Sequence, residues 1–156
     1  MGCAVGRSSF ELARQVPEVA GIDFSRGFIR AAQTLGTRGS LRFKLKLEGT
    51  LTQPATAKAP PRQIRNRVTF QTGDALQLPA LGRFDLVLAA NLLDRVKDPK
   101  KLLQMVLPSL VLPGGLLLLT SPYTWSQEFT PQSRWLRDSF PAIRKLLSPQ
   151  DRKSVV

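Results

Sequence analysis

Histidine is absent from the sequence, and Cys3 is the only cysteine. A metal site with histidine ligands and a histidine general base are therefore excluded, and we expect no metal. Because one cysteine cannot form an internal disulfide, we expect a reducing compartment and a cytoplasmic location. Runs of eighteen apolar residues are absent too, so we expect no transmembrane helix and no membrane partner. No charged segment followed by an apolar run opens the chain, as a secretory signal would require.

Positive charge is in excess and is concentrated in one segment. The 156 residues are a one-domain length, and a hydrophobic fraction of 42% is enough for a globular core. The net charge is +12, and residues 37–67 contain eight lysines and arginines against one glutamate. Such a segment can contact phosphates, but no aromatic interleaving for base stacking accompanies the charges. We therefore favour a solvated, poorly ordered loop there, and do not favour nucleic acid as a partner.

Local patterns predict alternating strands and helices. Short runs of β-forming residues predict strands over 19–24, 68–71, 84–90 and 116–120. Apolar residues at helical spacing predict helices over 8–15, 25–35 and 98–107, with a weaker helical region over 130–147. Ser8 or Ser9 is expected to cap the first helix, while Ser25 caps the second and Gly36 stops it. This alternation indicates an α/β sandwich with a mainly parallel sheet.

Two further segments lie between and after these elements. Residues 41–47 (LRFKLKL) alternate apolar and basic side chains, which suits an exposed edge strand or a hairpin arm. Residues 53–61 (QPATAKAPP) are rich in proline and alanine and are expected to form a loop. We expect one domain over residues 1–147, with a basic insert at 37–67, and a polar, frayed tail over 148–156.

Two motifs near the N-terminus predict a nucleotide site. Residues 2–9 (GCAVGRSS) place small residues before a helix, where the backbone can approach a ligand and helix N–H groups face it. Taken alone, this segment is equally well an ordinary tight turn. Asp23 follows Gly6 by seventeen residues, at the end of the next predicted strand, where an acidic side chain accepts hydrogen bonds from ribose hydroxyls. The alternative for Asp23 is a helix cap, a role that Ser25 fills better.

Three later motifs complete the pattern: residues 73–75 (GDA), residues 84–92 (FDLVLAANL) and residues 112–115 (LPGG). All five, in this order, resemble class I methyltransferases that depend on S-adenosylmethionine. A nicotinamide-dependent Rossmann enzyme is the nearest alternative. Its G-x-G-x-x-G pattern is absent, because Gly2 and Gly6 are four residues apart.

Longer strings resemble one family more closely. They are similar to the C-terminal methyltransferase domain of the ovothiol synthases (OvoA), in which it is a mercaptohistidine N-methyltransferase. The basic stretch LRFKLKLEG resembles that family's insert after the second helix, and SPYTWSQEFTP is the most specific string. The likeness runs from residue 2 to about residue 135. The other strings that carry it are GCAVGRSSFELA, VAGIDFSRGFIRAAQ, GDALQLP, FDLVLAANLLDRV and GGLLLLTSPYTWSQEFTP.

The resemblance implies S-adenosylmethionine as cofactor and methyl transfer to a small molecule, at an imidazole nitrogen of a thiol-histidine. By position, the glycine loop would line the methionine and ribose end, and Asp23 would hold the ribose. Asp74 and Ala75 would bracket the adenine, and Asn91 would lie beside the sulfonium. The implied cofactor residues are Gly2, Ala4, Gly6, Asp23, Phe24, Asp74, Ala75 and Asn91.

The resemblance also implies an acceptor side formed by Tyr123, Trp125 and Glu128. Core packing is an equally good interpretation of Tyr123 and Trp125. The sulfonium donor is already activated, so the protein mainly positions the nucleophile in line, and a neutral imidazole needs little base. No catalytic residue is assigned, although Asp94 or Glu128 could take a proton.

The family's sheet has the strand order 3-2-1-4-5-7-6, and only the equivalents of strands 2, 3, 4 and 5 are evident here. Met1 corresponds to the last residue or so of strand 1. We therefore expect a Rossmann-like methyltransferase sandwich that is incomplete, a truncated chain that folds poorly and binds the cofactor weakly. A non-catalytic remnant is one alternative. A nucleic-acid-binding or nucleic-acid-methylating module is another, although residues 89–94 (AANLLD) lack the D/N-P-P-Y/F string of enzymes that methylate exocyclic base amines.

Overall fold

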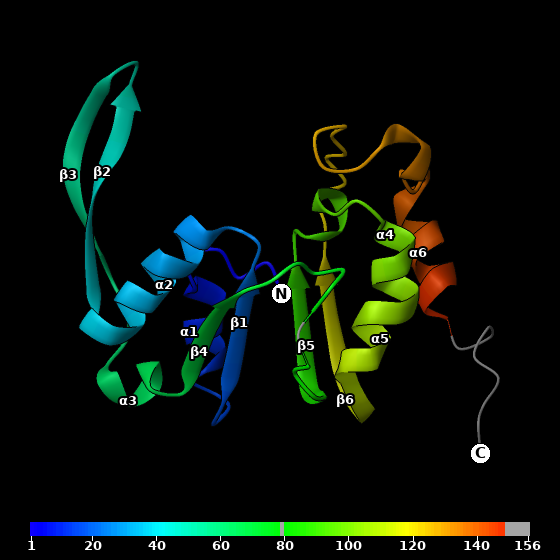
Figure 1. Ribbon diagram of the computed structural model, residues 1–156, viewed down its shortest axis with the longest axis horizontal. Coiled ribbons are helices and arrows are strands. Elements are labelled where there is room, and N and C mark those ends of the chain that lie inside the picture. Colours follow the sequence, from blue (N-terminus) through cyan, green and yellow to red (C-terminus); the bar gives the residue numbers. More distant parts are fainter. Residues whose placement is uncertain (79, 149–156) are drawn as a thin grey trace. The chain divides into compact units, whose positions relative to one another are not determined.

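The computed structural model describes residues 1–78 and 80–148. The frayed tail expected over 148–156 therefore lies, but for residue 148, outside the described residues. The described residues form two compact units: an N-terminal unit of residues 2–73, and a C-terminal unit of residue 1, residues 74–78 and residues 80–148 (Figure 1). Within the described ranges no helix has the length and hydropathy needed to span a membrane.

The N-terminal unit is built on a parallel pair of strands. β1 and β4 pair from Val19 opposite Val68 to Asp23 opposite Thr72, which confirms both predicted strands. β2 and β3 form an antiparallel hairpin. In chain order the elements of this unit are α1 (Arg7–Leu12), β1 (Val19–Asp23), α2 (Arg26–Arg38), β2 (Ser40–Glu48), β3 (Leu51–Lys58), α3 (Arg62–Arg65) and β4 (Val68–Thr72).

The ring of Phe70 in β4 leaves no room for a side chain at two glycines of this unit. A Cβ atom at Gly6 would lie 2.5 Å from Phe70 Cζ, and a Cβ atom at Gly21 would lie 2.6 Å from Phe70 Cδ1. The Phe70 ring also meets Phe10 of α1 edge-on, with 5.3 Å between the ring centroids. The helix and the strand pair can pack this closely because neither glycine has a side chain.

The C-terminal unit contains the second parallel pair, β5 and β6, which pair from Phe84 opposite Val111 to Ala90 opposite Thr120. Helical segments cover one side of the pair and enclose a core whose most buried members are leucines (Figure 1). The elements are β5 (Phe84–Ala90), η1 (Leu93–Arg95), α4 (Pro99–Lys101), η2 (Leu102–Val106), α5 (Leu107–Leu110), β6 (Val111–Thr120), η3 (Gln132–Arg134) and α6 (Ser139–Leu147).

The helix predicted at residue 98 begins as expected but changes pitch. Asp98 Oδ1 accepts a hydrogen bond from Lys101 N at 3.0 Å, and Pro99 occupies the first turn. Residues 102–106 form a π-helical turn before α5. Pro108 has no N–H to donate to the preceding turn, so the widened turn ahead of it has a local cause.

Three predicted helix boundaries are wrong. Neither Ser8 nor Ser9 caps α1, because Gly6, at φ 90°, turns the chain directly into a helix that begins at Arg7. That helix ends at Leu12 rather than at residue 15. Gly36 does not stop α2: the helix continues to Arg38, and Gly39 ends it at φ 78°.

A side chain from a distant segment supports the extra turn of α2. Arg65 Nη1 donates to the carbonyl oxygens of Gly36 at 2.7 Å and of Thr37 at 3.0 Å. These are carbonyl groups of the last helical turn, which lack partners within the helix. A glycine inside a helix costs about 1 kcal/mol relative to alanine, and this cap offsets part of that cost.

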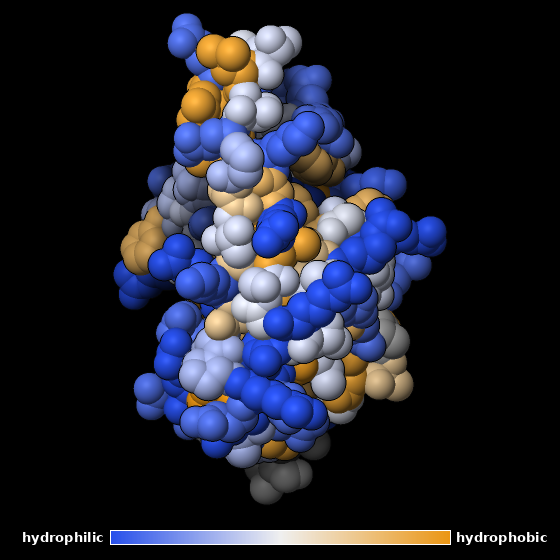
Figure 2. All heavy atoms as spheres, turned by 90° about the vertical axis from the view of Figure 1, so that its left-hand side faces the viewer, coloured by the Kyte–Doolittle hydropathy of each residue, from blue (hydrophilic) through white to orange (hydrophobic). Residues whose placement is uncertain are grey.

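The basic insert is ordered, which corrects the expectation of a loop over 53–61. β3 covers most of that range, and Pro54 lies opposite Lys44 of β2. Proline is tolerated there because β3 needs hydrogen bonds on one side only. Figure 1 shows the hairpin extending away from the rest of its unit, and Figure 2 shows orange hydrophobic residues at its outer end.

Two predictions for the C-terminal unit also need correction. The strand predicted over 116–120 begins earlier: β6 starts at Val111 and includes the LPGG segment, and a shift in register between Phe84 and Leu86 accommodates the extra residues. The helical region expected over 130–147 is two pieces, η3 and α6. The remaining pattern of parallel strands joined through helices confirms the α/β class. Within the described ranges the strands form three separate two-stranded sheets: β1–β4, β2–β3 and β5–β6.

We predict that Gly21→Ala lowers the free energy of unfolding by about 1–3 kcal/mol, because the added methyl group overpacks the Phe70 ring. Urea unfolding of the chain, followed by circular dichroism, measures the change. Gly27→Ala is the matched control: its Cβ would lie 3.7 Å from Ser25 Oγ, an ordinary contact, on an exposed helix position. It should leave stability unchanged or raise it by up to about 1 kcal/mol. Equal shifts for both variants would contradict the role given to Phe70.

Candidate functional site

The glycine loop of the N-terminal unit holds an unusual backbone shape. Gly2, Ala4 and Gly6 have φ values of 67°, 46° and 90°, a left-handed conformation that alanine rarely adopts. Cys3 N donates to Ile22 O at 3.0 Å, and Gly6 N donates to Cys3 O at 2.8 Å. The loop is therefore fixed by backbone hydrogen bonds to itself and to β1.

Asp23 joins this loop to the start of α2. Its Oδ2 accepts from Ala4 N and its Oδ1 from Ser25 N, both at 2.9 Å. Its own carbonyl oxygen accepts from Gly73 N at 3.0 Å, just beyond β4. Ser25 Oγ accepts from Phe28 N at 3.2 Å, which confirms the predicted cap. Each carboxylate oxygen retains a second acceptor direction, so the half-buried side chain can still accept hydrogen bonds from a ligand diol.

Two neighbours of Asp23 differ sharply in exposure. Phe24, the next residue, has 78% of its surface exposed, an unusual setting for a phenylalanine. Cys3 is buried, and its Sγ lies near the carbonyl oxygen of Ala4. Burial, and next the negative charge of Asp23, raise the pKa of the Cys3 thiol to about 11. The thiol is therefore protonated at neutral pH and is a poor nucleophile.

Asp74 and Ala75, the residues expected at the adenine, open the C-terminal unit. Asp74 Oδ1 accepts from Leu76 N at 2.8 Å, and its carbonyl oxygen accepts from Gln77 N at 3.0 Å. Asp74 thus closes a local turn. Ala75 is partly buried against the leucine core of the same unit.

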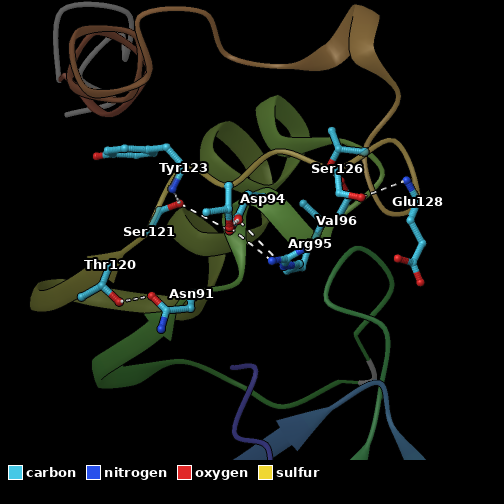
Figure 3. Close-up of polar contacts among 11 residues, drawn as sticks. Asn91, Asp94, Arg95, Val96, Thr120, Ser121, Tyr123, Ser126 and Glu128 are labelled. Atoms are coloured by element: carbon cyan, nitrogen blue, oxygen red, sulfur yellow. Dashed lines mark hydrogen bonds and ion pairs between the residues drawn. The ribbon is translucent and has the colours of Figure 1, made fainter.

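Asn91 lies where β5 ends, beside the end of β6 (Figure 3). Its backbone has φ 52°, and its N–H donates to Thr120 O at 2.9 Å. Thr120 Oγ1 lies 3.3 Å from Asn91 Oδ1 and donates to it. The side chain of Asn91 is exposed, so its amide group remains able to bind a ligand at the carboxyl ends of the two strands.

A buried carboxylate connects the two segments that follow β5 and β6. Asp94 has 0% of its surface exposed, and it accepts from Thr124 Oγ1 at 2.7 Å and from Ser121 Oγ at 3.4 Å (Figure 3). Arg95 Nε lies 3.8 Å from Asp94 Oδ2, and an Arg95 terminal nitrogen donates to Thr124 Oγ1 at 3.2 Å. These bonds fix the SPYTW segment against the residues that follow β5.

The three residues expected on the acceptor side occupy different settings. Tyr123, at φ 55°, is 40% exposed and lines a hollow of about 480 Å³ between β6 and α6. Trp125 is half-buried against the leucine core, and its Nε1 donates to Ser139 Oγ at 3.1 Å, so core packing describes it well. Glu128 is exposed, and in Figure 3 its carboxylate points away from Asp94.

Sequence reasoning named Asp94 only as a group that could take a proton, and it left out Ser121 and Thr124. The sequence carried little signal for this role. Asp94 follows two leucines, but Arg95 and Lys97 come soon after it, so the local pattern does not indicate that its carboxylate is buried. Over residues 1–78 and 80–148, no group of three His, Cys, Asp or Glu residues is placed to hold a metal ion.

The chain belongs to the methyltransferase domain family. A family model described as "Methyltransferase domain" matches residues 1–154, nearly the whole sequence. No curated protein sequence matches the chain. The parallel strand pairs, the glycine loop and Asp23 described above agree with this membership.

Several solved structures are similar in fold. The YcgJ protein of Bacillus subtilis has a TM-score of 0.55 at 16% identity, over 74% of this chain and 39% of that one. The glycopeptide N-methyltransferase MtfA has a TM-score of 0.54 at 18% identity, over 78% and 46%. The CcbJ methyltransferase of Streptomyces caelestis has a TM-score of 0.54 at 21% identity, over 74% and 41%. The chain spans less than half the length of each of these three proteins.

We predict that Asp94→Ala lowers the free energy of unfolding by about 3 kcal/mol, because two hydroxyl groups lose hydrogen bonds to a charged acceptor. Thr124→Val, which removes one donor at constant shape, should cost about half as much. Chemical denaturation measures both. Asp85→Ala removes an exposed carboxylate of β5 and should change stability by less than about 0.5 kcal/mol. If Asp94→Ala behaved like Asp85→Ala, the carboxylate would not fix the segment.

Proposed function

We propose that this chain carries out methyl transfer from S-adenosylmethionine to a small molecule. The observation that carries the proposal is the Asp23 carboxylate, which is held at the end of β1 by Ala4 N and Ser25 N and still has acceptor capacity. Membership of the methyltransferase domain family supports it. MtfA, a protein of similar fold, has been solved in complex with sinefungin and with (S)-adenosyl-L-methionine, and this also supports the proposal.

The residues present fit such a cofactor by their chemistry. Asp23 would accept hydrogen bonds from the two ribose hydroxyls, and Gly2, Ala4 and Gly6 would present backbone at the methionine and ribose end. The exposed ring of Phe24 offers an apolar face to an adenine base. The close approach of the Phe70 ring accounts for the lack of a side chain at Gly6, so the same loop would serve both packing and binding.

From the resemblance of the sequence motifs we also assign cofactor contacts to three residues of the C-terminal unit. Asp74 and Ala75 would bracket the adenine while the turn that Asp74 closes keeps them in place. By the same resemblance Asn91 would lie beside the sulfonium, and its exposed side chain at the end of β5 leaves it able to do so. When bound, S-adenosylmethionine supplies an activated methyl group, and the protein contributes binding and orientation.

For the acceptor we propose an imidazole nitrogen of a thiol-histidine, from the resemblance of the SPYTWSQEFTP string. Tyr123 and Glu128 are exposed and would contact it, as a wall and as a charge partner. Trp125, which packs against the core, would act mainly by supporting the segment. The bound cofactor would supply the methyl group and would leave as S-adenosylhomocysteine, and the methylated imidazolium would lose its N–H proton to solvent. A neutral imidazole needs no strong base, so the lack of histidine in the chain is no obstacle.

The cofactor proposal predicts saturable binding of S-adenosylmethionine, weaker than micromolar, in isothermal titration calorimetry. Asp23→Ala should weaken it by about tenfold or more, because a charged hydrogen-bond acceptor is lost. An analogue lacking the ribose 2′-hydroxyl distinguishes direct recognition of the ribose by Asp23 from the role of Asp23 in holding the glycine loop. The wild-type chain should bind it less well than the parent cofactor, while Asp23→Ala should not distinguish the two. Asp85→Ala is the matched control and should bind like wild type. Equal discrimination by Asp23→Ala and wild type would show that Asp23 does not touch the ribose.

The acceptor proposal predicts a product one methyl group heavier when the chain is incubated with S-adenosylmethionine and a thiol-histidine, detected by mass spectrometry. Histidine itself and imidazole thiols without the amino-acid part complete the panel. Methylation of the thiol-histidine alone would support the proposal. Cofactor binding without methylation of any acceptor would instead favour a non-catalytic remnant.

A further inference from the structure

The β2–β3 hairpin is a part of the molecule that the proposed function does not use. Its strands run over nine and eight residues, about 25–30 Å of extended chain. In Figure 1 it extends beyond α2 as an arm of the N-terminal unit. The insert between α2 and α3 is thus an ordered hairpin with two faces.

One face of the hairpin is mainly apolar. The register places Leu41 opposite Ala57, Phe43 opposite Ala55 and Leu45 opposite Gln53. Beyond a register shift, Leu51 lies opposite the exposed Glu48. Exposure is high along this side and is greatest near the turn: Phe43 44%, Leu45 42%, Leu47 57% and Leu51 64%. Orange residues at the outer end of the hairpin in Figure 2 show the same feature. A contiguous exposed apolar surface of this kind marks an interaction site.

The opposite face of the hairpin is basic. Strand alternation puts Arg42, Lys44 and Lys46 together on it, opposite Thr56, Pro54 and Thr52. Within the described ranges the ion pairs join Arg14 to Glu11, Arg95 to Asp94 and Arg134 to Asp98, so none of them neutralises the hairpin. Three like charges about 7 Å apart along one strand therefore face solvent.

The expectation of no membrane partner came from the lack of a long apolar run, which bears only on spanning helices. We propose that this hairpin binds the surface of an anionic lipid bilayer. The apolar face, with Leu47 and Leu51 at the strand ends beside the turn, enters the boundary between headgroups and acyl chains, and the exposed carboxylate of Glu48 stays on the water side of that boundary. The basic face then lies within the headgroup layer, close to the lipid phosphates and carboxylates. Amphipathic elements of this composition bind through buried apolar area together with attraction to anionic lipid.

Charge and polarity favour this occupant over two others. A nucleic acid would neutralise Arg42, Lys44 and Lys46 but would leave the apolar face in water. A second copy of the chain would cover the apolar face and leave the basic face unused. An anionic bilayer is the one occupant of the three that uses both faces. The proposal does not rest on the proposed methyl transfer.

The test is sedimentation of the full chain with vesicles. Vesicles of phosphatidylcholine mixed with phosphatidylserine should bind it, and vesicles of phosphatidylcholine alone should not. Binding should weaken as salt is raised, because the headgroup attraction is screened. The triple variant Arg42→Gln/Lys44→Gln/Lys46→Gln should bind about 100-fold less well, at about fivefold for each charge.

Two further variants separate the hairpin from net charge. Leu47→Ser/Leu51→Ser keeps every charge and should still weaken binding by about tenfold, because two apolar side chains no longer enter the bilayer. Arg26→Gln/Arg30→Gln/Lys100→Gln removes three exposed charges elsewhere and should bind within about threefold of wild type. Circular dichroism shows that each variant is folded.

Each contrary result overturns the proposal. Equal losses in the two triple variants would show that net charge, not the hairpin, causes binding. An unchanged Leu47→Ser/Leu51→Ser variant would show that no apolar contact is made. Binding to duplex RNA but not to vesicles would identify a nucleic-acid surface. A dimer that this double variant dissociates, without vesicle binding, would identify a second copy as the occupant.

Discussion

The candidate cofactor site depends on the hydrogen bonds that the carboxylate of Asp23 accepts. Its two oxygens accept N–H groups from the glycine loop and from the start of α2, and its carbonyl oxygen accepts one from the residue after β4. Four chain segments therefore meet at one residue. Such a carboxylate needs no reorganisation to accept a ligand hydroxyl, because its position is already fixed.

The C-terminal unit uses a similar device in a drier setting. Asp94 is completely buried, and the hydroxyl groups of Ser121 and Thr124 bring the segment after β6 to it. Burial of a carboxylate is costly, and here the hydrogen bonds and the nearby guanidinium of Arg95 offset that cost. In each unit an acidic residue at or after the end of a parallel strand thus holds neighbouring chain segments together by hydrogen bonds.

Prediction from the sequence succeeded where local pattern and tertiary packing agree, and failed where they conflict. The strand over 84–90 was predicted to the residue, because six of its seven residues are apolar and the segment packs in the core beside β6. The prediction of a loop over 53–61 was wrong. The prolines and alanines there are typical of a loop, but pairing with β2 supplies hydrogen bonds that the local sequence does not indicate. The prediction that Gly36 stops α2 was wrong for the same reason: Arg65, twenty-nine residues away, donates to carbonyl groups of the last helical turn.

The sequence by itself determined the α/β alternation, the glycine loop, Asp23 and the family, because these follow from residue type and short spacing. Only the tertiary structure decided that Gly6 and Gly21 accommodate Phe70, that Trp125 packs against the core, and that the basic insert is a two-faced hairpin. These facts depend on contacts between residues far apart in the chain. Side-chain identity alone does not specify such contacts, because the same residue suits a core, a turn or a ligand until its neighbours are fixed.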